Sequence, residues 1–173
     1  MRDPDDRGRV AALSIACADY AELVTGLPPT SRDGDCFFDD LPPGRTTASM
    51  LKLGISDDRD RLIALLDVVM DYPDAGVWYV GLLLIHPEFR RQGLGRSLVN
   101  GLASHARAQG AASLRLGVVE ANAPALAFWL RLGFRAIGDA PDHHIGVRVH
   151  RVIEFEYALS DRAPMLHERP RFG

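Results

Sequence analysis

The sequence predicts an α/β fold, and three neighbouring stretches carry that prediction. An unbroken apolar run, Val77–Ile85, is closed by Pro87 and has the length and composition of a buried central strand. The next stretch repeats apolar residues every four positions, as one face of an amphipathic helix does, at Leu94, Leu98, Leu102 and Ala106. A second strand follows, in which apolar residues alternate with polar or small ones, at Leu114, Leu116 and Val118. A strand, a helix and a strand in this order are typical of a mixed α/β domain.

Length and composition set the outer limits of the fold. The chain has 173 residues, which favours one domain with a sizeable core; we expect it over residues 1–160, followed by a charged tail over 161–173. Hydrophobic residues make up 47% and charged residues 25%, as in soluble globular proteins. The sequence has no run of about 18 apolar residues, so it predicts no membrane span. The charged start MRDPDDRGRV lacks the apolar core of a signal peptide. We therefore expect a cytoplasmic protein with no membrane partner.

The charge and the cysteines argue against other classes of protein. A net charge of −3 and an isoelectric point of about 6.0 argue against nucleic acid as a partner. Cys17 and Cys36 lie in no paired-cysteine motif and beside no histidine cluster, so we predict no disulfide framework and no metal site. We interpret both as small, half-buried apolar side chains. Aspartates cluster in the first half of the chain, either as solvated loops or as a groove that attracts a cationic amine.

The first 45 residues are expected to form one helix and one loop. Apolar residues three and four positions apart predict a helix over Asp6–Leu23, ended by Gly26. The stretch Thr30–Arg45 is rich in proline, glycine and aspartate, which predicts a loop with at most one helical turn. Phe37 and Phe38 within it either wall a substrate pocket or, in the favoured interpretation, anchor the loop to the core.

Strand patterns flank the central run on both sides. Thr46–Ile55 and Leu62–Met70 are predicted strands joined by a polar turn, which makes an antiparallel hairpin. After the second strand, Asn122 is expected to cap a helix that Gly133 ends. Phe134–Ile137 then begins another strand.

The last part of the predicted domain consists of a loop and a final strand. Gly138–Ile145 is predicted to be a loop that holds His143 and His144. In the final strand, alternation places five apolar residues on one face: Val147, Val149, Ile153, Phe155 and Tyr157.

The junction between the central strand and the following helix predicts an anion site. The first turn of a helix offers unpaired N–H groups and the positive end of its dipole. Gly93 and Gly95 lack a Cβ, which lets a phosphate approach the backbone, and Arg90, Arg91 and Arg96 add positive charge. Taken alone, two glycines fit an ordinary strand–helix turn with a solvated basic rim equally well.

Two motifs around this junction narrow the choice. Arg90-Arg91-Gln92-Gly93-Leu94-Gly95, after a strand that ends in Ile-His-Pro, resembles the pyrophosphate-binding motif R-x-x-G-x-G of the GNAT superfamily of N-acetyltransferases. The block from Asn122 to Phe134 resembles the family's later segment, N-x-x-A-x-x-x-aromatic-x-x-x-G-F. The resemblance implies a mostly antiparallel twisted sheet of about six strands, splayed at its middle and flanked by helices. The family's opening strand is not found here, so the sheet is expected to begin one strand short.

The resemblance also implies acetyl-CoA as the acyl donor, acting as a co-substrate. Its pyrophosphate would lie on the backbone N–H groups of the loop, and its pantetheine arm would pair with the end of the central strand like an added strand. The backbone N–H near Leu83 would polarise the thioester carbonyl. The binding residues implied in this way are Leu83, Leu84, Ile85, Arg90, Arg91, Gln92, Gly93, Leu94, Gly95, Arg96, Asn122 and Trp129.

The family's usual acid–base residues are missing. The position of its strand glutamate is Gly81, and the position of its later tyrosine is Trp129, whose indole N–H cannot deliver a proton at a useful pKa. We therefore expect Tyr79 and His86 as the catalytic residues. Further candidates are Asp67, Tyr72, His143 and His144.

The activity implied by the resemblance is transfer of an acetyl group from acetyl-CoA to a primary amine by direct attack. A small molecule is the expected acceptor. Two alternatives stay open: acetylation of a protein N-terminus or lysine, and a degenerate domain that binds acyl-CoA without catalysis, which the missing glutamate and tyrosine motivate. The resemblance is also consistent with a homodimer.

Overall fold

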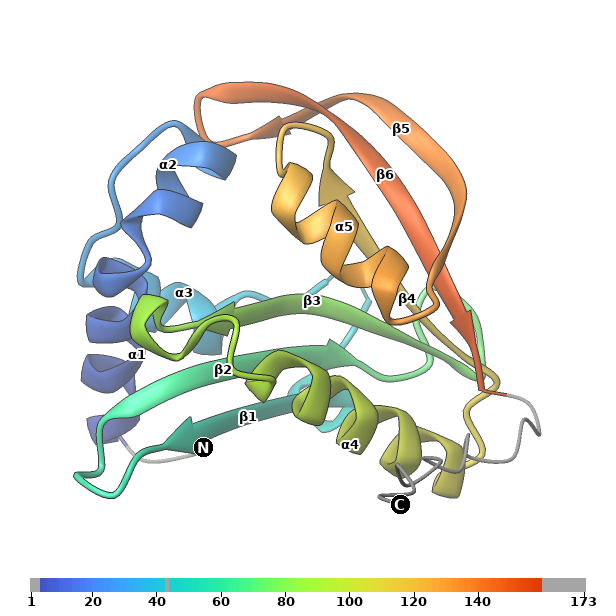
Figure 1. Ribbon diagram of the computed structural model, residues 1–173, viewed down its shortest axis with the longest axis horizontal. Coiled ribbons are helices and arrows are strands. Elements are labelled where there is room, and N and C mark those ends of the chain that lie inside the picture. The colour runs from blue at the N-terminus through green and yellow to red at the C-terminus, as the bar shows by residue number, and fades with distance from the viewer. Residues whose placement is uncertain (1–3, 43, 160–173) are drawn as a thin grey trace, which may run out of the picture.

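A single twisted sheet runs through the protein, with helices on both of its faces (Figure 1). The computed structural model describes residues 4–42 and 44–159, so the predicted tail lies outside the described residues. The six strands follow the spatial order β1-β2-β3-β4-β6-β5. All neighbouring strands are antiparallel except the parallel pair β3 and β4, which confirms the predicted mostly antiparallel α/β fold. The strands are Met50–Ser56 (β1), Leu62–Val69 (β2), Val77–Ile85 (β3), Ser113–Val119 (β4), Arg135–Ile145 (β5) and Arg148–Ala158 (β6).

The helices divide the core into two clusters, one on each face of the sheet. The larger cluster packs the last helices against the middle of the sheet, and the smaller packs the first helices against β2 and β3. The helices are Pro4–Ala16 (α1), Ala18–Thr25 (α2), Arg32–Asp39 (α3), Leu94–Ala108 (α4) and Ala123–Arg131 (α5). None of these described helices is both long and apolar enough to cross a membrane.

The N-terminal segment holds two helices where the sequence predicts one. The break falls at Cys17, between α1 and α2, and Gly26 ends α2 in the left-handed conformation with φ of 76°. Within the described residues the first strand is β1, which follows the helices α1, α2 and α3. Cys17 is 1% exposed and Cys36 is exposed, so the prediction that both are half-buried is wrong.

The stretch predicted to be mostly loop contains the two-turn helix α3. Gly34 makes this helix possible because a Cβ at this position would lie 2.2 Å from the carbonyl oxygen of Arg7, so α1 and α3 approach each other at backbone distance. Phe37 and Phe38 are half-buried and pack against the smaller core cluster, which supports their interpretation as anchors.

The predicted hairpin and central strand are confirmed. β1 and β2 pair antiparallel, although β1 begins at Met50 because a short 3-10 turn occupies Thr47–Ser49. β3 has the predicted bounds and lies between β2 and β4.

The middle of the sheet is splayed, as the resemblance implies. β3 pairs with β4 only over Val77–Tyr79, although β3 continues to Ile85. On the other side of β3, the register with β2 shifts between Asp67 and Val68, so that Gly81 forms a bulge. The last residues of β3 therefore leave β4 and open a V-shaped gap in the backbone pairing.

Helix α4 buries one face against the sheet, displaced from the predicted stripe. Leu94 and Leu98 are only half-buried, because the side of the helix that carries Gly95 approaches the sheet most closely. The buried positions are Gly95, Val99, Leu102, Ala103 and Ala106.

Helix α5 begins at the predicted cap. The side-chain oxygen of Asn122 accepts a hydrogen bond from the Ala125 N–H at 3.2 Å, and Pro124 occupies the first turn. We expect Asn122→Ala to lower the free energy of unfolding by about 1 kcal/mol, because an N–H of the first turn loses its partner. Urea denaturation measures this change. Asn122→Ser, which keeps a capping oxygen, should restore most of the stability, and equal stability of all three proteins would contradict the capping role.

The final hairpin is longer than predicted. β5 runs through Ile145, so the predicted loop over Gly138–Ile145 is wrong; two register shifts against β6 explain its irregular pattern. Val147 and Val149 are 70% and 54% exposed and do not share the buried face of β6. The reason is geometric, since β4 pairs with β6 only from Val152 onward, whereas the earlier part of the hairpin meets α2.

Candidate active site

The loop between β3 and α4 has the backbone geometry of an anion site. Gly93 caps α4 with φ of 88°, a left-handed conformation that favours glycine, and Arg91 precedes it with φ of 61°. A Cβ on Gly93 would meet nothing within 4 Å, so the space over the start of the helix is open. α4 has 15 residues, long enough to develop a helix dipole, and begins at Leu94. These features fit a phosphate group on the first N–H groups of the helix.

The second glycine of the motif has a different role. Gly95 is buried, and a Cβ there would lie 3.1 Å from Ile85 Cδ1 and 3.1 Å from Phe128 Cζ. Gly95 therefore lets α4 pack closely against β3 and α5, and it does not face the space that an anion would occupy.

Three arginines surround the loop, and one of them holds it in place. Arg90 donates from Nε to the Ile85 carbonyl at 2.8 Å, and its guanidinium pairs with the Asp19 carboxylate, with one contact at 3.0 Å. This hydrogen-bonded pair lowers the pKa of Asp19 and links the loop to α2. Arg91 and Arg96 are exposed and make no ion pair with any described residue, so they are the arginines available to a bound anion.

We expect Arg90→Ala to weaken acetyl-CoA binding roughly fivefold, because the loop loses its tie to α2 and β3 while the positions of Arg91 and Arg96 become less fixed. Calorimetric titration with acetyl-CoA measures this effect. Asp19→Asn should give a similar change, and the double variant should be little worse than either single one because the two residues share one pair. Fully additive losses would show that Arg90 contacts the ligand itself.

The end of β3 presents its backbone to the splayed gap at alternate residues. The His86 N–H donates to the Ile63 carbonyl at 2.8 Å, which fixes the antiparallel alternation so that Leu84 faces β2. Leu83 and Ile85 consequently direct their N–H and C=O groups away from β2, toward the gap. The Ile85 carbonyl already accepts from Arg90 and from the Cys17 thiol, at 3.4 Å. The Leu83 backbone and the Ile85 N–H are thus the groups that can pair with an extended ligand.

Asn122 and Trp129, the two predicted ligand contacts of the later motif, both have structural positions. The Asn122 side chain is engaged as the cap of α5. Trp129 is 6% exposed and lies in the larger core cluster between Phe128 and Phe134, with each ring centroid 4.9 Å away. This burial favours a place for Trp129 in the core over the predicted contact with the ligand.

Tyr79 lies at the point where β3 leaves β4. Its hydroxyl would be 3.0 Å from a Cβ on Gly117, and its ring meets Tyr72 edge to face with centroids 5.8 Å apart. Burial, Glu154 and Tyr72 all raise the pKa of Tyr79, so its phenol keeps its proton at neutral pH. This geometry suits a proton donor or a hydrogen-bond donor and opposes a role as a base.

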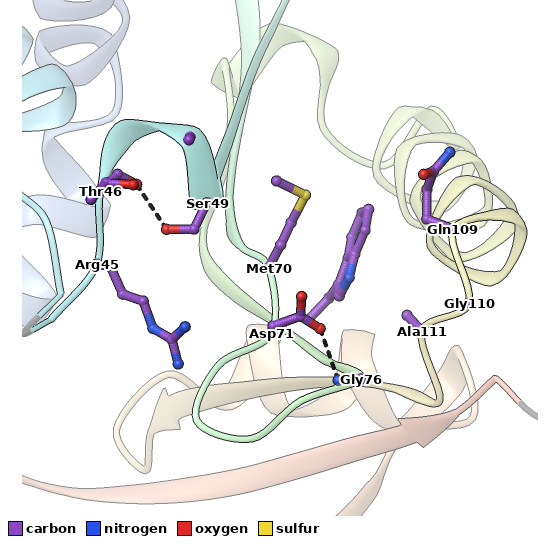
Figure 2. A pocket seen from close by; sticks show the side chains of 11 residues that line it. Arg45, Thr46, Ser49, Met70, Asp71, Gly76, Gln109, Gly110 and Ala111 are labelled. Atoms are coloured by element: carbon purple, nitrogen blue, oxygen red, sulfur yellow. Dashed lines mark hydrogen bonds between the residues drawn. The ribbon is translucent and has the colours of Figure 1, made fainter.

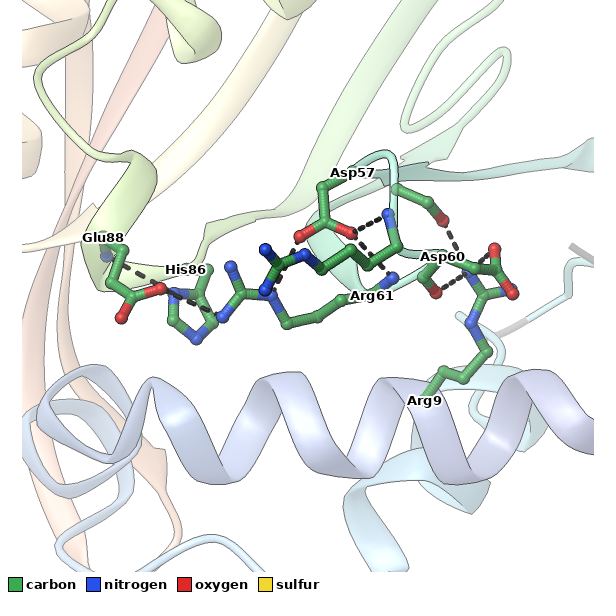
Figure 3. Close-up of polar contacts among 8 residues, drawn as sticks. Arg9, Asp57, Asp60, Arg61, His86 and Glu88 are labelled. Carbon is green, nitrogen blue, oxygen red and sulfur yellow. Dashed lines mark hydrogen bonds and ion pairs between the residues drawn. The ribbon is translucent and has the colours of Figure 1, made fainter.

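His86 has a structural position at the end of β3 (Figure 3). Its Nδ1 accepts a hydrogen bond from the Glu88 N–H at 3.3 Å and so caps the turn Pro87–Phe89. Glu88 forms an ion pair with Arg61, which also pairs with Asp57. This position favours a structural role over the catalytic role expected for His86.

The remaining candidates are divided between surface and interior. His143 and His144 are exposed on β5, where His143 lies opposite His150 of β6 in the final hairpin. Asp67 on β2, in contrast, is only 18% exposed and pairs with Lys52 on β1 at 3.2 Å. Sequence reasoning gave no role to Lys52, although it is the only lysine of the chain.

A hollow of about 490 Å³ lies at the other end of α4 (Figure 2). It is lined by residues such as Arg45, Met70, Asp71 and Gln109. α4 spans about 22 Å at 1.5 Å per residue, which separates this hollow from the Gly93 loop at the start of the helix. The hollow is therefore not part of the candidate site.

Comparison with known proteins shows the family to which the chain belongs. The model of the Acetyltransferase (GNAT) family matches residues 18–134, about two thirds of the chain. The chain belongs to this family. The match ends before β5 and β6, so the hairpin that these strands form lies outside the family's matched region.

Solved structures of the family share the fold over most of the chain. The ribosomal-protein-S18-alanine N-acetyltransferase from Escherichia coli is 17% identical, with a TM-score of 0.67 and 95% of each chain covered. An acetyltransferase from Thermus thermophilus is 22% identical, with a TM-score of 0.70, and the match covers 90% of this chain and 92% of that one. These likenesses confirm the GNAT fold.

A relative with closer sequence is the [ribosomal protein bS18]-alanine N-acetyltransferase of Salmonella typhimurium. It is 35% identical over 79 residues, which are 46% of this chain and 50% of the relative. The chain thus spans about half the length of the curated relative it matches.

Proposed function

We propose that this protein transfers an acetyl group from acetyl-CoA to the primary amine of a small molecule. The observation that carries the proposal is the junction of two features, the open left-handed Gly93 cap of α4 and the splayed end of β3 beside it. One feature suits a pyrophosphate and the other an extended amide-bearing arm. Acetyl-CoA carries both groups and supplies an acetyl thioester.

The residues of the gap support acyl transfer by direct attack. The N–H of Leu83 would donate to the thioester oxygen and stabilise the negative charge that develops there during attack by the amine. Tyr79 holds its proton beside the same gap. The positive end of α4 favours the departing thiolate, whose free pKa of about 8.5 makes departure without a strong acid feasible.

The preference for a small acceptor rests on a bridge between the final hairpin and α2. The Val147 N–H donates to the Thr25 carbonyl at 2.8 Å, and His150 Nε2 lies 2.8 Å from the Val24 carbonyl. Figure 1 shows the end of the β5–β6 hairpin curving over to α2. We define these contacts, together with Gly146, as the hairpin–α2 bridge. The bridge limits the length of an acceptor that crosses between the two elements, which favours a compact amine over a polypeptide.

A second candidate acceptor is a protein N-terminus. The relative from Salmonella is named as an alanine N-acetyltransferase that acts on a ribosomal protein, and half of its length aligns with this chain. Under this alternative, the hairpin–α2 bridge would have to open before the peptide enters.

Release of the CoA thiol in the presence of acetyl-CoA and an acceptor tests both candidates. The acceptors are a panel of small primary amines, including polyamines, amino acids and aminoglycosides, and a ten-residue peptide that begins with alanine. Turnover with an amine of the panel supports the proposal. Turnover with the peptide alone would overturn it in favour of the protein acceptor, and tight acetyl-CoA binding without turnover would indicate a binding domain.

A further inference from the structure

We propose that Asp67 accepts the proton of the acceptor amine. This inference rests on the proposed acetyl transfer and adds the base that the reaction requires. An alkylammonium has a pKa of about 10, so at neutral pH the amine must lose a proton before its lone pair can attack. Three observations support this role.

The first observation is the position of Asp67 across the bulge of β3. In the β2–β3 pairing, Asp67 lies opposite Leu82. Leu82 is next to Leu83, whose N–H faces the gap. Gly81 is the extra residue of the bulge, and a Cβ there would stand 3.7 Å from Asp67 Oδ2. Because Gly81 has no side chain, nothing at this position separates the carboxylate from the exposed side of the bulge.

The second observation is that the two carboxylate oxygens have different surroundings. Lys52 Nζ lies 3.2 Å from Oδ1 of Asp67. The same ammonium donates to the Phe37 carbonyl at 2.6 Å and lies 4.6 Å from the centroid of the Phe37 ring. Lys52 therefore fixes one oxygen of the carboxylate from β1 and α3, while Oδ2 points to Gly81 and remains available to a substrate.

The third observation is burial. The Asp67 and Lys52 side chains are 18% and 10% exposed. Burial raises the pKa of Asp67, while Lys52 and, to a smaller extent, the backbone N–H of Val68 oppose this rise. A carboxylate with a raised pKa is a better base, because its pKa lies closer to the pKa of the ammonium that it deprotonates.

Asp67 takes one proton from the acceptor ammonium, and the freed lone pair forms the N–C bond with the thioester carbonyl carbon. The C–S bond breaks, and its electron pair leaves on sulfur. The nitrogen then loses its second proton, which goes to the thiolate through solvent, and Asp67 returns the first proton to water.

The test compares wild type with Asp67→Asn, using the amine that gives turnover in the panel. We expect kcat to fall about 100-fold, the size of a typical general-base contribution, while the affinity for acetyl-CoA stays within about twofold. In wild type, kcat/KM should fall as the pH drops through the raised pKa of Asp67, because only the ionised carboxylate accepts a proton. Asp67→Asn should lack this acidic limb.

A second variant separates proton transfer from a structural role of the ion pair. Gly81→Glu in the Asp67→Asn background places a new carboxylate at the same point of the bulge, and its Cβ has room beside residue 67. We expect this double variant to regain at least about tenfold of kcat. Lys52→Met, which also breaks the pair, should keep more activity than Asp67→Asn.

Two results would overturn the proposal. The first is an Asp67→Asn protein with wild-type kcat and an unchanged pH profile. The second is an equal loss in Lys52→Met and Asp67→Asn with no recovery in the double variant, which would assign a purely structural role to the pair. Absence of turnover in wild type would instead reject the proposed function, so the two failures are distinguishable.

Discussion

Gly93→Glu should weaken acetyl-CoA binding by about 100-fold or more, which makes it one of the two largest effects expected. Gly93 has φ of 88°, and its missing Cβ faces open space at the start of α4. A glutamate here would extend a carboxylate over the N–H groups proposed to hold the pyrophosphate, so it would repel the ligand and occupy its place. Calorimetric titration with acetyl-CoA, or CoA alone, measures the loss.

The same helix offers a matched control for this substitution. Gly110 follows the other end of α4 with φ of 83°, and a Cβ there also meets nothing within 4 Å. Gly110→Glu therefore introduces the same charge at the same left-handed conformation, far from the proposed anion site, and should bind acetyl-CoA like wild type. Equal binding by Gly93→Glu and wild type would remove the pyrophosphate from this loop. Equal losses in both variants would indicate only general strain.

Strongly periodic patterns predicted most of the fold, and packing between distant segments decided the rest. β3 is an apolar run bounded by turns, so its limits were readable from the sequence. The sequence did not predict α3, because this helix depends on the contact of Gly34 with the Arg7 carbonyl. A local sequence pattern does not show a contact between segments so far apart. The second half of β5 is polar and exposed, and it is a strand only because β6 pairs with it.

The candidate site shows the same division. The glycine motif predicted a loop that opens into a helix, and the structure adds that Gly93 caps this helix in the left-handed conformation. The motif could not reveal that Arg90 pairs with Asp19, which lies 71 positions away in the sequence, or that Asp67 meets Lys52 across the first hairpin. Side-chain pairs of this kind depend on register and on helix placement, which single-sequence periodicity does not determine. The ligand contacts of the predicted loop residues therefore remain predictions.

Gly146→Ala is the substitution expected to change acceptor choice most. Gly146 has φ of 60°, and a Cβ there would lie 2.4 Å from the Thr25 carbonyl oxygen and 2.7 Å from Thr25 Cβ. The Thr25 backbone leaves no room for this Cβ, and the left-handed conformation of residue 146 disfavours alanine. The hairpin must therefore move away from α2. We expect kcat/KM for the small amine to fall about tenfold, while the alanine peptide loses less or gains, because the hairpin–α2 bridge opens.

A left-handed glycine in open space controls for the conformational strain of this substitution. Gly44 has φ of 72°, and a Cβ there meets nothing within 4 Å, so Gly44→Ala carries a similar backbone cost without a clash. It should leave the ratio of kcat/KM for the peptide and the small amine unchanged, whereas Gly146→Ala should raise that ratio. An unchanged ratio in Gly146→Ala would mean that the acceptor enters by a route that the bridge does not control.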